Sequence, residues 1–147
     1  MWERANPSDF NEIVSMCADL YREDPSSYNV DQAGIRRTLA ALEQDPKRGF
    51  PVVLKIQNEI KGYALLISFW SNELGGQICV IDELYVKPDS RSKGHAKNLI
   101  QSLANKSPLW PGELASIELE VTPDNKRARE LYTKLGFKFV RNSMMRL

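Results

Sequence analysis

Apolar residues recur at helical spacing in two segments near the start of the chain. The first segment follows N-P-S-D (residues 6–9), where Asn6 is a capping residue and Pro7 suits a first helical turn. This helix should end near Asp24, and a second one should end near Asp45, because a proline follows each aspartate. The predicted inward faces contain Phe10, Ile13, Val14, Cys17, Leu20 and Tyr21 in the first helix and Ile35, Leu39 and Leu42 in the second.

The period then changes to that of strands. Residues 51–56 and 60–70 are β-branched and aromatic runs separated by Gln-Asn-Glu, which predicts a hairpin. A turn at residues 71–76 leads into a strand at 77–86, which Pro88 closes.

Two strand-helix units follow. The helix after Gly94 should turn Ala96, Leu99, Ile100 and Leu103 inward, and a strand at 115–121 precedes a helix whose inward face contains Ala128, Leu131, Tyr132 and Leu135. Gly136 is a natural C-terminal stop, after which residues 137–147 should return as a final strand or a pair of short strands. The chain is therefore predicted to be one α+β domain spanning residues 1–147, with a mostly antiparallel front and two strand-helix units behind.

Composition limits the functional classes. Twenty Lys and Arg residues against nineteen Asp and Glu give a net charge of +1, which provides no global field for nucleic acid or an anionic membrane. Cys17 and Cys79 are the only cysteines and His95 is the only histidine, a set that argues against structural zinc and a disulfide framework and fits a reducing compartment. Because there is neither an apolar signal core nor a run of about 18 apolar residues, we expect a cytoplasmic protein.

A basic, glycine-containing turn lies between the strand at 77–86 and the next helix. The helix start aims unpaired backbone N–H groups and the helix dipole at one point, which suits a phosphate. Gly94 and Ala96 allow close backbone approach, and Arg91 and Lys93 add positive charge. The alternative is a solvated connection that happens to be basic. Neither a GxxxxGK[ST] nor a GxGxxG arrangement is present.

Two signatures give this turn a context. V-K-P-D-S-R-S-K-G-H-A (residues 86–96) resembles the acetyl-CoA pyrophosphate loop of the GNAT N-acetyltransferases, [RQ]-x-x-G-x-[GA], at Arg91, Gly94 and Ala96. P-D-N-K-R-A-R-E-L-Y-T-K-L-G-F (residues 123–137) resembles that family's N-x-x-A-x-x-L-Y-x-x-x-G-F pattern. R-A-N-P-S-D (residues 4–9) is similar to the usual opening of the family, although the strand before it is very short.

The resemblance implies a three-layer α/β/α fold whose mixed, mostly antiparallel sheet splays between its fourth and fifth strands. Acetyl-CoA is the implied cosubstrate, with no metal, and its pantetheine arm would lie in the splay. A backbone N–H near Leu84 or Tyr85 would polarise the thioester carbonyl. The residues implied to contact the cofactor are Leu84, Tyr85, Val86, Arg91, Ser92, Lys93, Gly94, His95, Ala96, Asn125, Ala128, Tyr132 and Lys134.

Each of the more specific roles has a structural alternative. The resemblance makes Tyr132 the proton donor to the CoA thiolate, whereas the helical pattern alone makes it a core residue. Asn125 either contacts the pantetheine arm or caps its helix, and both can hold. His95 is expected to face outward as a neighbour of the phosphates. Lys134 either approaches the nucleotide end of CoA or belongs to a solvated face.

Glu83 is the second candidate catalytic residue. Strand alternation places Glu83 and Tyr85 on one face and Leu84 and Val86 on the other, so Glu83 can point toward the cleft. It would take the proton of the acceptor ammonium or only attract that cation. Asp82 should face the other way unless a β-bulge shifts the register.

The function implied is transfer of acetyl from acetyl-CoA to a primary amine by direct attack in a ternary complex. The acceptor is a small-molecule or protein amine, and a homodimer remains open; neither nucleic acid nor a membrane is expected as a partner. Residues 21–31 belong to the implied acceptor side, and the acidity of Glu23, Asp24 and Asp31 beside Tyr28 favours a cationic acceptor. The alternative is a non-catalytic CoA-binding or interaction module that retains the fold.

Overall fold

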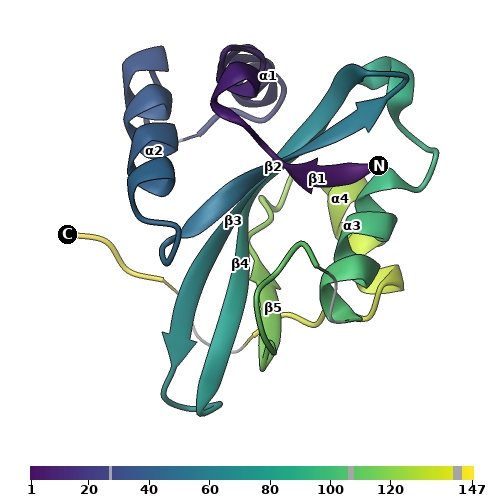
Figure 1. Cartoon of the computed structure of the whole chain (residues 1–147). Helices are drawn as coiled ribbons and strands as arrows, with labels where there is room; N and C mark the ends of the chain where they lie inside the picture. Colours follow the sequence, from purple (N-terminus) through teal and green to yellow (C-terminus); the bar gives the residue numbers. More distant parts are fainter. Residues whose placement is uncertain (27, 106–107, 141–143) are drawn as a thin grey trace.

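A five-stranded mixed sheet forms the centre of the protein (Figure 1). The computed structural model describes residues 1–26, 28–105, 108–140 and 144–147. The strands are β1 (Trp2–Arg4), β2 (Gly49–Ile56), β3 (Glu59–Ser71), β4 (Gly76–Val86) and β5 (Ser116–Leu119), in spatial order β1-β2-β3-β4-β5. Neighbouring strands are antiparallel except β4 and β5, which are parallel. The first strand is as short as the sequence predicts.

The two N-terminal helices are α1 (Phe10–Glu23) and α2 (Gln32–Gln44), which end where the sequence predicts. Asn6 begins a 3₁₀ turn, Pro7–Asp9, and its backbone N–H donates to Asp9 Oδ2 at 2.9 Å, so the turn is tied before it enters α1. The side chain of Asp31 caps α2 by accepting from the Gly34 N–H at 2.7 Å. Local polar groups therefore set both helix starts.

The β2–β3 hairpin has the predicted position. Gln57 and Asn58 have φ values of 51° and 64°, the left-handed pair that a two-residue type I′ turn requires. Because Asn tolerates this region better than most residues, the turn fixes the register of a hairpin that is continuous apart from one bulge near Leu54.

The second half of the chain contains α3 (His95–Ala104), β5 and α4 (Lys126–Lys134). The parallel strand is shorter than the predicted 115–121. Gly136 has a φ of 95°, as expected after a helix, but residues 137–140 and 144–147 form no strand. The predicted final strand is thus wrong for those residues, and 141–143 lie outside the described residues. Phe139 and Val140 are exposed, so little burial of their side chains compensates for ordering them as a strand.

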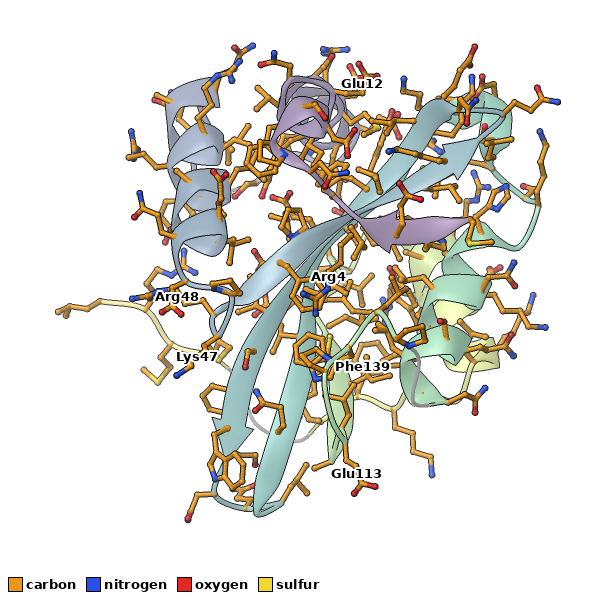
Figure 2. The ribbon with its side chains drawn as sticks, viewed as in Figure 1. Arg4, Glu12, Lys47, Arg48, Glu113 and Phe139 are labelled. Atoms are coloured by element: carbon orange, nitrogen blue, oxygen red, sulfur yellow. The ribbon has the colours of Figure 1, made fainter. Side chains whose placement is uncertain are left out.

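Two hydrophobic cores lie on opposite faces of the sheet. Alternate residues of β2 divide between them: Val52 and Leu54 pack with Leu99 of α3, and Val53 packs with Leu39 of α2. At the rim of the first core Arg4 stacks on Phe50, with 3.9 Å between the guanidinium carbon and the ring centroid (Figure 2). Figure 1 shows α1 and α2 on one side of the sheet and α3 and α4 on the other, which confirms the three-layer α/β/α architecture.

Candidate active site

The sheet opens where β4 and β5 part. The two strands pair from Ile78 with Ser116 to Ile81 with Leu119, after which β4 continues to Val86 paired only with β3. The opening forms a cleft of about 960 Å³. Its walls are Leu20, Glu23, Asp24, Pro25, Leu84, Tyr85, Val86, Ser90, Arg91, Ser92, Gly94, His95, Ala96, Lys97, Thr122, Pro123, Asp124, Asn125, Arg127, Ala128, Leu131 and Tyr132.

The backbone of β4 presents free groups to this cleft. Lys87 donates its N–H to Lys61 O on the β3 side at 2.8 Å, and the register from Val86 back to Glu83 is regular. Because backbone groups alternate in direction along an antiparallel strand, the N–H groups of Val86 and Leu84 point away from β3, and that of Tyr85 points toward it. Of the two N–H groups predicted to polarise a carbonyl, only that of Leu84 is therefore directed into the splay.

A β-bulge decides which carboxylate lies where on β4. Leu65 pairs with Glu83 and Leu66 pairs with Ile81, so Asp82 is the extra residue. Desolvation raises the pKa of the Asp82 carboxyl, and the charges of Glu83 and Glu120 raise it further. Alternation keeps Glu83 on the same face as Tyr85, toward α1, and the bulge places Ile81 on the opposite face, in the core beneath α3.

Glu83 is held by three donors on that face. Tyr21 donates to its Oε1 at 2.6 Å, Tyr63 donates to its Oε2 at 2.8 Å, and the Cys17 thiol lies 3.5 Å from Oε2. Burial, followed by the charge of Glu83, raises the pKa of the Cys17 thiol to about 12. Burial likewise raises the pKa of Tyr21 and of Tyr63, so all three donors keep their protons at neutral pH. The Glu83 side chain does not line the cleft.

The loop between β4 and α3 has an unusual backbone. Gly94 has a φ of 80° and caps α3, and a Cβ placed there would meet no atom within 4 Å. Ser92 is also left-handed, with a φ of 64°. The loop therefore presents its N–H groups and the start of α3 to open space at the cleft, the arrangement that binds phosphate.

Arg91 anchors this loop. Its Nε donates to Val86 O at 2.6 Å, and its Nη2 donates to Oε1 and Oε2 of Glu23 at 2.9 and 2.8 Å. The guanidinium also lies 5.1 Å from the centroid of the Tyr85 ring. Its charge is thus compensated by a carboxylate at the end of α1.

Asp24, the neighbour of Glu23, bridges to the other side of the cleft. Its carboxylate accepts from Thr122 Oγ1 at 3.0 Å and from Asn125 Nδ2 at 3.2 Å. Together Glu23 and Asp24 connect the β4 side to the β5 side across the end of α1. Both carboxylates are engaged within the protein although they line the cleft, and Asp31 caps α2, so the preference for a cationic acceptor stays a prediction.

The start of α4 provides the third wall. Asn125 Oδ1 accepts from the Ala128 N–H at 3.1 Å, so this side chain caps the helix while its Nδ2 contacts Asp24. Tyr132 is half-buried beside Phe137, with 5.7 Å between the ring centroids, and it lines the cleft. Burial raises the pKa of the Tyr132 hydroxyl, which keeps its proton at neutral pH.

The cleft brings together most of the residues that the sequence predicted as cofactor contacts, but Lys93, Lys134 and the catalytic candidate Glu83 lie outside its walls. The outward orientation predicted for His95 is wrong: its Nε2 is buried without a hydrogen-bond partner in the described part of the chain, and its carbonyl accepts from Trp2 Nε1 at 2.9 Å. Sequence reasoning missed Lys97 and Arg127, which line the cleft from the first turns of α3 and α4. Their proximity to the two signatures was the available signal.

Comparison with known proteins identifies the family. Residues 13–137 match the model of the acetyltransferase (GNAT) family, and the chain therefore belongs to this family. No curated protein sequence matches it significantly.

Solved structures share the fold over the whole chain. A "possible acetyltransferase" from Clostridium difficile 630 has a TM-score of 0.83 at 20% identity, with 100% of this chain and 95% of that chain covered. A predicted acetyltransferase with acetyl-CoA from Clostridium acetobutylicum has a TM-score of 0.79 at 19% identity, with 100% of this chain and 95% of that chain covered. A ribosomal-protein-alanine N-acetyltransferase from Brucella melitensis biovar Abortus 2308 has a TM-score of 0.77 at 19% identity, with 100% of this chain and 99% of that chain covered. At these identities the likeness concerns the fold alone.

Within the described ranges, no helix is long and apolar enough to cross a membrane. The same residues contain no group of three or more His, Cys, Asp or Glu side chains that could hold a metal ion.

Proposed function

We propose that this protein is an N-acetyltransferase that moves acetyl from acetyl-CoA to a primary amine by direct attack within a ternary complex. The observation that carries the proposal is the splay beyond Ile81 and Leu119, which joins three features in one cleft. These features are free β4 backbone groups, the left-handed Gly94 loop, and the protonated hydroxyl of Tyr132. A phosphate-bearing, extended thioester requires all three.

In this proposal the chain's own residues divide the work. The N–H groups of the loop at 91–96 and the start of α3 receive the pyrophosphate, and the Leu84 N–H stabilises the developing charge on the thioester oxygen. The amine nitrogen bonds to the acetyl carbon as the carbon–sulfur bond breaks, and Tyr132 gives its proton to the departing sulfur. The proton that the attacking nitrogen loses as it becomes an amide restores the Tyr132 hydroxyl. The raised pKa of Tyr132 keeps this proton available above neutral pH.

The proton of the acceptor amine must leave before attack, because an alkyl ammonium has a pKa of about 10.4. Glu83 is our candidate to take it. Neither its carboxylate nor the Tyr21 hydroxyl that donates to it at 2.6 Å lines the cleft, so the proton would reach Glu83 only through an intervening water.

A panel of amines assayed for thiol release from acetyl-CoA tests the activity, and Tyr132→Phe tests the assignment. Loss of a positioned proton donor should lower kcat by roughly 10²- to 10⁴-fold while the CoA Kd changes little, because the ring that lines the cleft remains. Lys134→Gln, on the same helix but outside the cleft, is the matched control and should retain wild-type kcat. Unchanged turnover of Tyr132→Phe on a confirmed acceptor would make the hydroxyl structural.

A further inference from the structure

Four basic side chains in or next to the loop at 91–96 are Arg91, Lys93, Lys97 and Arg127. The first two already form contacts within the protein. Arg91 donates hydrogen bonds to the Glu23 carboxylate and to the Val86 carbonyl, and the carboxylate compensates its charge. Lys93 Nζ donates to Asp89 O at 3.0 Å and lies outside the cleft. Lys93 therefore does not reach the cleft, and the charge of Arg91, which does line it, is already paired. Arg91 instead acts as a positioning residue, which fixes the loop to β4 and α1.

The other two cations, Lys97 and Arg127, both line the cleft. Among the residues that the structure describes, neither forms an ion pair with a carboxylate. Arg127 Nη2 donates to Ser92 Oγ at 3.0 Å, and both Arg127 and Lys97 are exposed. Two uncompensated positive charges, contributed by the first turns of two different helices, therefore face the same opening next to the loop.

We propose that Arg127, together with Lys97, binds the ribose 3′-phosphate of CoA and makes this protein discriminate between CoA and 3′-dephospho-CoA. This inference rests on the proposed function. The backbone N–H groups of the loop bind the pyrophosphate, and the 3′-phosphate at the adenosine end of CoA must find other donors. A dianion at an exposed mouth is bound by an arginine fork and a lysine point charge. Ser92 holds Arg127 beside the loop, so less side-chain freedom is lost on binding.

Calorimetric titration of CoA and of 3′-dephospho-CoA into the wild type, Arg127→Gln and Lys97→Gln tests the proposal. The wild type should bind CoA about tenfold more tightly, and this preference should shrink with added salt. Arg127→Gln should reduce the ratio to about threefold or less without changing the Kd for 3′-dephospho-CoA. Arg129→Gln is the matched control: its guanidinium lies 4.9 Å from the Phe139 ring centroid, outside the cleft, and the ratio should be retained.

Two results would overturn this assignment while leaving the proposed function standing. The first is equal binding of both ligands by the wild type, or a CoA preference that survives in Arg127→Gln and Lys97→Gln. The second is an equal loss of affinity for both ligands in Arg127→Gln, which would place its role at the pyrophosphate or in the loop itself. If the wild type binds neither ligand, the proposed function fails and the inference fails with it.

Discussion

The buried hydrogen bond between Tyr63 and Glu83 gives a quantitative prediction. Tyr63 is fully buried at 0% relative exposure and donates to Glu83 Oε2 at 2.8 Å. Tyr63→Phe keeps the ring and removes only this donor. A hydrogen bond to a charged group contributes about 1.5–3 kcal/mol, so we expect a loss of about 2 kcal/mol in the free energy of unfolding. For a chain of this size that corresponds to about 4–8 °C in Tm.

Urea denaturation with linear extrapolation is the assay, and the m-value should stay unchanged because no surface is newly exposed. Tyr28→Phe is the control: Tyr28 is 58% exposed and should stay within about 0.5 kcal/mol of wild type. Tyr21→Phe completes a cycle, since Tyr21 donates to the other carboxylate oxygen. The double variant should lose more than the sum of the single ones, because Glu83 then keeps only the Cys17 thiol.

A Tyr63→Phe variant within about 0.5 kcal/mol of wild type would refute the reasoning. It would mean that water or another group satisfies the carboxylate of Glu83 in solution when the Tyr63 hydroxyl is absent. Additive losses in the cycle would likewise show that the two tyrosines do not share one carboxylate.

Three further predictions concern Gly94 in the loop at 91–96, the candidate base Glu83 and the buried thiol of Cys79. Gly94→Asp should abolish the CoA-induced rise in Tm, which for the wild type at a CoA concentration of about 100 times the Kd corresponds to about 2.7 kcal/mol. Gly94→Asn places an uncharged side chain at the same φ of 80° and should keep most of this rise. Equal shifts in both variants would contradict a phosphate site at this position. Glu83→Gln should lower kcat and remove the acidic limb of its pH profile, while an effect on KM alone would restrict Glu83 to attracting the acceptor. Burial raises the pKa of the Cys79 thiol to about 12, whereas the thiol of the unfolded chain has the ordinary pKa of about 8.5. Between these two pH values only the unfolded chain loses the proton, so the free energy of unfolding should fall by about 1.4 kcal/mol per pH unit as the pH rises. Below about pH 8.5 the contribution of this thiol to stability is complete. Cys79→Ala should flatten the alkaline dependence of unfolding free energy by that amount, and a wild-type slope in the variant would contradict the assignment.

Local sequence determined the elements that depend on local chemistry. The ends of α1 and α2 follow from a proline after each helix, and the β2–β3 turn follows from Asn58 in a left-handed position. The loop at 91–96 could also be located, because a glycine that begins a helix after a strand is a short-range signal. These features require contacts only between residues close in the chain.

Tertiary structure alone decided the features that depend on long-range contacts. The bulge at Asp82 exists because β3 and β4 differ by one residue between two buried stretches, and no pattern within β4 reveals it. The ion pair of Arg91 with Glu23 and the hydrogen bond of Asn125 to Asp24 join residues far apart in sequence, so the sequence could show the polar groups but not that they pair with one another. The missing C-terminal strand has the same cause, since a strand is stable only where a neighbour pairs with it, and neither 137–140 nor 144–147 pairs with β5.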